Sequence, residues 1–132
     1  MSDLRIIVTG GRKRDSQDDY ALLGERLDDI REVCRGMNHV IIQGGCPDGV
    51  DAMARRLARD RGAAVETYPA DFKQHPEDAV EVSNQTMVDQ GAYLCLAFPN
   101  APADGPSRGT WDMIRRAVAA GIETRIYPEA AS

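Results

Sequence analysis

The chain has 132 residues, a length that fits one domain, so we expect a single domain over residues 1–132. Hydrophobic residues make up 42% of the chain, and no apolar run approaches the ~20 residues that a membrane-spanning helix needs. The 21 acidic and 16 basic residues give a net charge of -5, whereas nucleic-acid binding depends on clustered Lys and Arg. The composition therefore predicts neither a nucleic acid nor a membrane as partner.

The ends and the cysteines indicate a reducing compartment. Residues 1–5 show no signal-peptide pattern before the first apolar run begins. The three cysteines, Cys34, Cys46 and Cys95, are odd in number and form no C-x-x-C pair. An odd count without a secretory signal indicates free thiols. We therefore expect a cytoplasmic protein.

Short apolar runs and amphipathic stretches alternate along the chain, with turn residues between them. The apolar runs predict strands over residues 5–9, 39–43, 64–68, 92–98 and 123–127. Apolar residues spaced by three and four predict helices over residues 18–34 and 50–61, one beginning near residue 76, and one after residue 109. This order predicts an α/β fold, a Rossmann-like three-layer sandwich with a five-stranded, mainly parallel sheet.

Three glycine-containing loops follow predicted strands. The loops after the first and second strands open with glycine pairs at residues 10–11 and 44–45, and the loop after the fourth carries Gly105 and Gly109. A strand–glycine–helix junction directs free backbone N–H groups to one point, which suits a phosphate. Each loop alone is also explained as a tight turn. Because ligands of open parallel sheets bind beyond the carboxyl ends of the strands, the convergence of the three loops favours a site.

Three segments carry a family resemblance: residues 8–12 (VTGGR), 43–51 (QGGCPDGVD) and 108–113 (RGTWDM). They resemble the signature loops of the SLOG superfamily and are most similar to its YspA/YpsA-related branch, with a match from about Arg5 to Tyr127. The resemblance implies a Rossmann-like fold and a bound nucleotide or nucleotide-derived ligand. It extends distantly to LOG-type phosphoribohydrolases, which cleave the N-glycosidic bond of cytokinin nucleotides.

The chain departs from the hydrolytic relatives where their chemistry resides. Ser83 and Met113 stand at the positions that match a family arginine and a family glutamate. Serine supplies no fixed positive charge, and methionine can neither move a proton nor stabilise an oxocarbenium-like centre. Any remaining catalysis would have to use other carboxylates, and Asp112 and Asp51 are the candidates. The third loop is also enlarged around residues 102–106.

The predicted ligand-binding residues come from the three loops and from the third predicted helix. They are Gly10, Gly11, Arg12, Gly44, Gly45, Cys46, Gly49, Asp51, Asn84, Arg108, Gly109 and Thr110. Arg12 and Arg108 are the best candidates for phosphate contacts, because a guanidinium forms bidentate, charge-assisted hydrogen bonds. The alternative for both is a solvated arginine. No metal site independent of a ligand is predicted.

Four further side chains have predicted roles, and three of them have two interpretations each. Asp48 is predicted to cap the second helix, and Asp51, which matches the family motif, to bind a ribose hydroxyl or a metal ion. Asn84 either tethers the loop after the fourth strand, which we favour, or reaches the ligand. Trp111 either stacks on a base or, as we favour, packs in the core. It would then face inward with the apolar residues that follow it at helical spacing, Ile114, Ala117 and Val118.

The leading hypothesis is a module that senses or sequesters a nucleotide or phosphorylated nucleotide derivative at the C-terminal edge of the sheet. Two alternatives stay open: a nucleotide N-glycosidase or phosphoribohydrolase that uses Asp51 or Asp112, and a scaffold whose pocket is vestigial. No cofactor is required, and Mg²⁺ is expected only together with a phosphorylated ligand. A homodimer is expected from the family resemblance alone.

Overall fold

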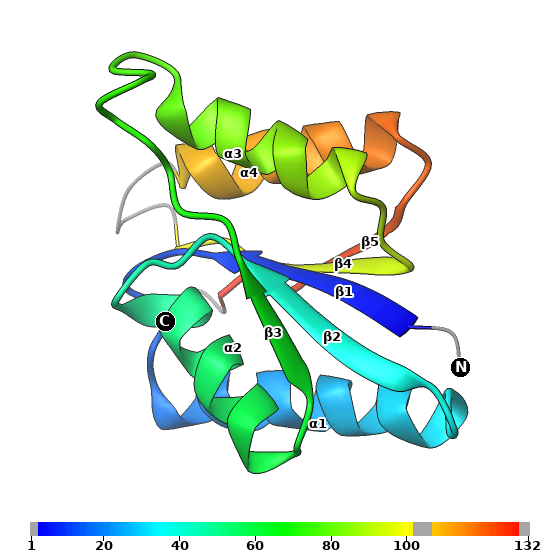
Figure 1. The fold of residues 1–132 in the computed structure, drawn as a ribbon. Coiled ribbons are helices and arrows are strands. Elements are labelled where there is room, and N and C mark those ends of the chain that lie inside the picture. Colours follow the sequence, from blue (N-terminus) through cyan, green and yellow to red (C-terminus); the bar gives the residue numbers. More distant parts are fainter. Residues whose placement is uncertain (1–2, 102–106, 130–132) are drawn as a thin grey trace.

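The computed structural model describes residues 3–101 and 107–129 (Figure 1). Within these ranges five strands and four helices alternate along the chain. The strands are β1 (Asp3–Gly10), β2 (Asn38–Gln43), β3 (Ala64–Thr67), β4 (Leu94–Phe98) and β5 (Glu123–Ile126). The helices are α1 (Gln17–Val33), α2 (Gly49–Asp60), α3 (Ala79–Asp89) and α4 (Arg108–Ala119).

The five strands form one parallel sheet in the order β3-β2-β1-β4-β5. Helices α1 and α2 cover one face and α3 and α4 the other, which confirms the predicted three-layer sandwich (Figure 1). The strand order reverses between β1 and β4, because α3 carries the chain from one edge back past β1. Loops that leave β1 and β4 therefore turn to opposite faces, and a crevice opens between them.

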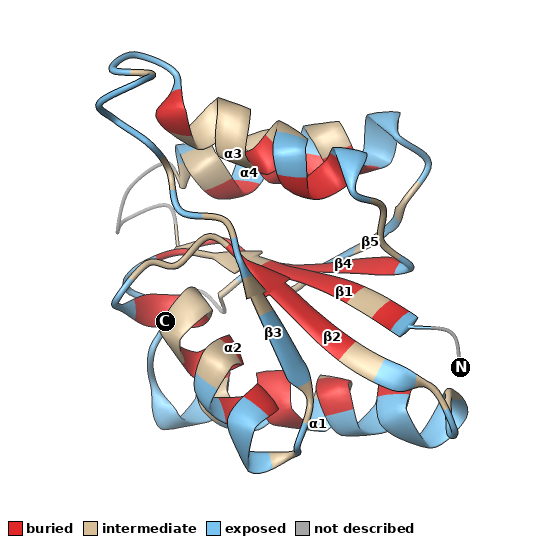
Figure 2. Ribbon diagram, in the orientation of Figure 1, coloured by how far each residue is buried: buried red, intermediate tan, exposed pale blue. Residues whose placement is uncertain are grey.

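The three inner strands carry the core on both of their faces (Figure 2). Along β1, Ile6 and Val8 pack toward α1 and α2, whereas Ile7 packs toward α3 and α4. Cys95 of β4 lies in the second cluster, and burial raises the pKa of its thiol to about 12. Cys95 is therefore an inert core residue, as its apolar surroundings in the sequence suggest.

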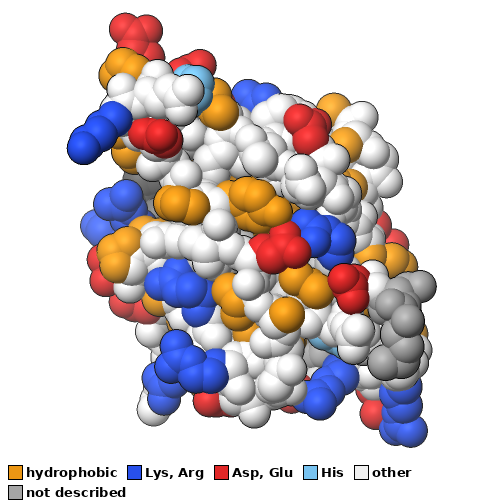
Figure 3. All heavy atoms as spheres, in the orientation of Figure 1, with side chains coloured by type: hydrophobic (Ala, Val, Ile, Leu, Met, Phe, Trp, Pro, Cys, Tyr) orange, Lys and Arg blue, Asp and Glu red, His pale blue; other side chains and the backbone are white. Residues whose placement is uncertain are grey.

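A polar network lies on the sheet face toward α3 and α4. The Arg5 guanidinium donates to the Glu66 carboxylate at 2.6 and 2.9 Å and to the Gly91 carbonyl at 2.8 Å. The Tyr68 hydroxyl donates to the same carboxylate at 2.7 Å. This network spans β2 from β1 to β3, over buried Ile42. In Figure 3 acidic and basic groups lie side by side among hydrophobic ones over the middle of this view.

Several predicted boundaries are wrong by a few residues. Helix α3 begins at Ala79 and not near Pro76, because residues 76–78 form a turn. Strand β4 begins at Leu94, and β3 and β5 each end one residue earlier than predicted. None of these differences moves a loop away from the C-terminal edge of the sheet.

The inward face predicted for the last helix is also wrong in part. Trp111 and Val118 are 39% and 59% exposed, while Ile114 and Ala117 are buried as predicted. The buried stripe of α4 is completed by Thr110 and Met113. Residues 110, 113, 114 and 117 also recur at helical spacing, so the sequence pattern fits two neighbouring stripes equally well. Packing against the sheet selects one of them.

Candidate functional site

A cavity of about 690 Å³ opens at the carboxyl ends of β1 and β2 and beside the start of α4. Its wall is built from the loops after β1 and β2, the segment before α3, the first half of α3, and the first residues of α4. Every predicted ligand-binding residue except Gly49 lines it. These residues are Gly10, Gly11, Arg12, Gly44, Gly45, Cys46, Asp51, Asn84, Arg108, Gly109 and Thr110. Residues 102–106 of the enlarged third loop, Gly105 among them, lie outside the described residues.

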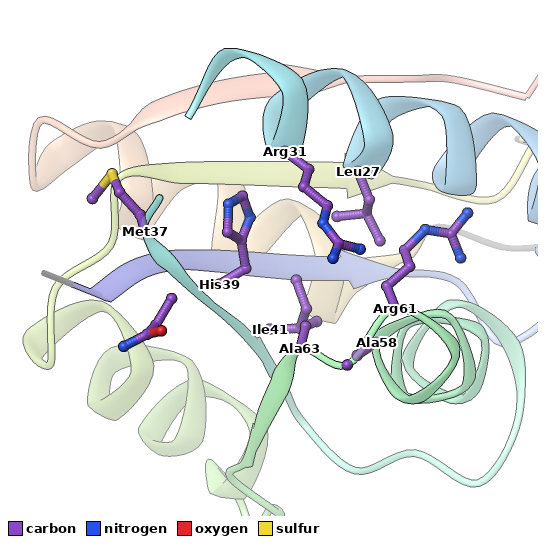
Figure 4. Close-up of a pocket in the computed structure, with 10 residues that line it drawn as sticks. Leu27, Arg31, Met37, His39, Ile41, Ala58, Arg61 and Ala63 are labelled. Carbon is purple, nitrogen blue, oxygen red and sulfur yellow. The ribbon is translucent and has the colours of Figure 1, made fainter. Parts of the chain in front are cut away.

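A second, smaller cavity of about 140 Å³ lies at the opposite edge of the sheet (Figure 4). It is lined by Met37 and His39 near the start of β2, by Leu27 of α1, and by Arg61 after α2. The Arg61 guanidinium donates to the Asp28 carboxylate at 2.7 Å. The carbonyl ends of both helices face this edge, and their partial negative charge disfavours anions. The larger cavity is therefore the candidate site.

The first loop is joined to the loop after β4 by close backbone contacts. The Gly11 N–H donates to the Phe98 carbonyl at 3.0 Å. A Cβ on Gly11 would lie 1.8 Å from Asn100 Oδ1, so a larger residue there would displace the Asn100 side chain. Gly10 also lines the cavity and packs closely on β4, because a Cβ there would lie 2.7 Å from the Phe98 carbonyl oxygen.

Arg14 fixes the back of this loop, and the sequence reasoning missed it. Its guanidinium, 2% exposed, donates to Asp19 at 2.9 Å and to the backbone carbonyls of Pro99 and Tyr127, each at 2.8 Å. It also lies over the Phe98 ring, 5.6 Å from its centroid. In the run of charged residues at 12–15 this arginine looks solvated, and only the tertiary structure shows it buried.

The second glycine loop is held by side chains that satisfy its own backbone. Gln43 Oε1 accepts the Gly45 N–H at 2.6 Å and a guanidinium N–H of Arg55 at 2.8 Å. Arg55 also donates to the Cys46 carbonyl at 2.8 Å, and Asp51 Oδ2 accepts the Cys46 N–H at 3.1 Å. Gln43 is fully buried. The loop therefore offers the cavity fewer free N–H groups than its glycines predict.

Asp51 is a loop-organising residue at one side of the cavity. Burial raises the pKa of its carboxyl, although the Cys46 amide, Arg55, the Gly44 amide and Arg12 each lower it. Asp48, predicted to cap α2, occupies the N-cap position but makes no side-chain capping bond. That prediction is wrong because the neighbouring acid, Asp51, binds loop amides from inside the first turn.

Gly49 is needed for packing and not for lining the cavity. Its φ is 69°, and a Cβ there would lie 2.4 Å from the Gly11 carbonyl oxygen and 2.5 Å from Arg12 Cα. The start of α2 therefore packs directly on the first loop. No side chain larger than hydrogen fits between the two.

The start of α4 has the opposite character from the second loop. Ser107, its N-cap, has a φ of 48° and makes no side-chain capping bond. Its Oγ instead accepts the Asn100 N–H at 2.7 Å. Among the described residues, the backbone N–H groups of Arg108, Gly109 and Thr110 have no acceptor. These groups and the positive end of the helix dipole lie at the cavity.

Asn84 tethers α3 to this start, as favoured from the sequence. Its amide donates to the Gly109 carbonyl at 3.1 Å and to Asp112 Oδ2 at 3.0 Å. Asp112 also accepts from Arg116 at 2.8 Å and does not line the cavity. Burial alone would raise the pKa of Asp112, but the hydrogen bonds from Arg116 and Asn84 bring it below its usual value. The two candidate catalytic carboxylates, Asp51 and Asp112, are therefore not both at the cavity.

Three basic side chains line the cavity: Arg12, Lys13 and Arg108. All three are exposed, and none forms a salt bridge with a described acidic side chain. Lys13 was not predicted, although its place beside Arg12 was a signal. Asp51 and Glu81 are the acidic residues of the lining. Within the part of the chain that the structure describes, no three His, Cys, Asp or Glu side chains gather as a metal site.

Fold and site together define a doubly wound α/β domain with an open cleft at its topological switch point. The chain belongs to the YspA, cpYpsA-related SLOG family, whose sequence profile matches residues 4–75. The match includes the first two glycine loops and ends before α3. No helix among the described residues is long and apolar enough to span a membrane.

Two individual proteins are also similar to this chain. The Gene 61 protein of Mycobacterium phage D29 is 34% identical over 123 residues, which covers 89% of this chain and 91% of that protein. The C-terminal domain of PF1911 hydrogenase from Pyrococcus furiosus is similar in structure, with a TM-score of 0.49 and 12% sequence identity. The structural match covers 96% of this chain and 94% of that domain.

Proposed function

We propose that this protein binds a nucleotide or a phosphorylated nucleotide derivative in the 690 Å³ cavity, as a sensor or a sequestering module. The observation that carries the proposal is the convergence of Arg12, Lys13, Arg108 and an uncapped helix start on one cavity. Membership of a SLOG family supports a nucleotide-related ligand. The chain's net charge of -5 does not oppose the proposal, because the local field of the cavity decides.

In this binding mode the phosphate lies at the start of α4. The N–H groups of residues 108–110, which have no acceptor among the described residues, donate to its oxygens, and the helix dipole favours the negative charge. Arg12 and Arg108 add charge-assisted hydrogen bonds, which a guanidinium forms in pairs. The Asp51 carboxylate, in the first turn of α2, lines the cavity and is suited to accept a hydroxyl of the ligand's sugar. Mg²⁺ is not required, and it would enter with the phosphates of the ligand.

No specific observation favours N-glycosidase activity. The Ser83 hydroxyl donates to the Tyr68 carbonyl, and Met113 is buried in the core. Asp112 is paired with Arg116 outside the cavity. The residues at the positions of the hydrolase arginine and glutamate therefore supply neither a positive charge nor a carboxylate, and binding without turnover is the function that this arrangement supports best.

The proposal is tested by measuring binding of a panel of nucleoside mono- and diphosphates by calorimetry, with native mass spectrometry of the purified protein for any molecule it retains. Arg12→Ala and Arg108→Ala should each weaken binding about tenfold or more, because each removes a charge-assisted hydrogen bond. Arg59 is an exposed arginine of α2 that does not line the cavity, so Arg59→Ala is the matched control and should leave the affinity unchanged. No binding across the panel and no retained molecule would overturn the proposal, and release of free base would replace it with hydrolysis.

A further inference from the structure

Phe72 is a large hydrophobic side chain at the cavity that the core does not use. The exposed large hydrophobic residues of the described chain are Val33, Val65, Phe72, Tyr93, Trp111, Val118 and Ile126. Of these, Phe72 alone lines the 690 Å³ cavity. Phe72 is 59% exposed, so its side chain contributes little to the stability of the core.

A turn centred on Asp71 holds Phe72 in place. Asp71 Oδ1 accepts the backbone N–H groups of Lys73 and Gln74 at 3.2 and 3.1 Å, and the Asp71 carbonyl accepts the His75 N–H at 2.9 Å. This turn lies in the segment that rises from β3 at the sheet to α3 in the helix layer (Figure 1). An aspartate side chain that accepts the backbone N–H groups two and three residues ahead stabilises a turn. Phe72 is therefore presented on a defined turn at the cavity.

The lining of the cavity takes apolar residues from the segment that carries Phe72 and from α3, and its basic residues from elsewhere. Pro69 and Ala70 from the same segment and Val80 from α3 share its lining. The basic residues come from other elements, the loop after β1 and the start of α4. A ligand that matches both kinds of lining residue has a phosphate and a planar group with apolar faces.

We infer that Phe72 is a specificity-determining residue that stacks on the planar base of the ligand, so that the cavity selects base-bearing phosphates over sugar phosphates. This inference rests on the proposed function and names the class of ligand that the same cavity takes. Every base offers a π face to an aromatic ring, and such stacking tolerates different bases. Trp111, the candidate for stacking from the sequence, is 39% exposed on α4 and does not line the cavity.

The test compares ligands with and without a base on matched variants. Affinities of AMP, GMP, CMP and UMP, and of ribose 5-phosphate, are measured by calorimetry on wild type and on Phe72→Leu, Phe72→Tyr and Trp111→Leu. Leucine keeps the apolar bulk but removes the ring, and tyrosine keeps the ring. Trp111→Leu removes an exposed aromatic ring of α4 that does not line the cavity.

Phe72→Leu should weaken the tightest-binding nucleotide about tenfold and leave ribose 5-phosphate unchanged. Phe72→Tyr and Trp111→Leu should both retain wild-type affinity. If Phe72→Leu weakened the binding of nucleotide and of sugar phosphate equally, the role of Phe72 would be only structural and the inference would be overturned. An unchanged affinity for the nucleotide would also overturn it. Both of these outcomes leave the proposed function standing. Wild-type protein that binds none of the five compounds and none of the nucleoside diphosphates, and that retains no molecule on purification, would overturn the proposed function and this inference together.

Discussion

The second glycine loop and the start of α4 look alike in the sequence and differ in the structure. Both place glycine at a strand–helix junction on one edge of the sheet. In the second loop, Gln43 and Asp51 accept the N–H groups of Gly45 and Cys46, so the loop satisfies itself. At α4, the N–H groups of residues 108–110 have no acceptor among the described residues. Glycine therefore indicates a close turn, and side chains elsewhere decide whether its amides remain for a ligand.

The largest expected contrast between these regions comes from their glycines. Gly49→Ala should lower the free energy of unfolding by about 3 kcal/mol or more, because a left-handed alanine is strained and its Cβ would collide with the first loop. Gly109→Ala should change it by no more than about 1 kcal/mol, since among the described residues the new Cβ meets only Val80 Cγ1, at 3.2 Å, and alanine favours a helix. Urea denaturation measures both. Similar losses in the two variants would contradict the contrast.

A smaller difference in stability is expected between one polar residue of each region, Gln43 in the second loop and Arg108 at the start of α4. Gln43→Ala should cost about 1–3 kcal/mol of stability, because the half-buried Gly45 N–H and the Arg55 guanidinium lose their acceptor. Arg108→Ala should change stability by less than about 0.5 kcal/mol, since this exposed side chain has no partner among the described residues. Chemical denaturation separates the two. If Arg108→Ala destabilised the fold as strongly as Gln43→Ala, the start of α4 would be structural in the same sense as the second loop.

The smallest expected effect is on the pH dependence of stability, which Asp51 and Asp112 should change in opposite directions. Burial raises the pKa of Asp51 above 3.8, so its ionised carboxylate lowers the free energy of unfolding at neutral pH. This loss of stability is relieved as the pH falls toward 3.8 and the carboxyl takes up a proton. Burial raises the pKa of Asp112 too, but the Arg116 and Asn84 hydrogen bonds lower it below 3.8 overall, so its favourable contribution is lost at pH values below 3.8.

Unfolding free energies of wild type, Asp51→Asn and Asp112→Asn between about pH 7 and about pH 3 test these signs. The advantage of wild type over Asp51→Asn should grow as pH falls, and its advantage over Asp112→Asn should shrink. Two curves with the same slope would mean that the two carboxyls experience the same environment.

Much of the site's position was predictable because parallel topology brings strand ends together. The glycine pairs at residues 10–11 and 44–45, with Arg12 and Arg108, were placed at one edge by strand order alone, and they line one cavity. Arg14, Gln43 and Phe72 were missed, because their roles depend on partners distant in sequence. Asp112 was a candidate on residue type, and only packing shows it turned toward Arg116. Cytoplasmic location and a homodimer stay predictions.

The sequence by itself determined the α/β class, the parallel sheet and the edge at which the glycine loops meet, because these follow from local periodicity and from the handedness of strand–helix–strand connections. Only the tertiary structure decided which backbone N–H groups are satisfied, which face of α4 is buried and which aromatic ring lies at the cavity. These depend on contacts between residues far apart in the chain, such as Arg14 with Tyr127 and Asn84 with Gly109. Local pattern contains no information on such pairs.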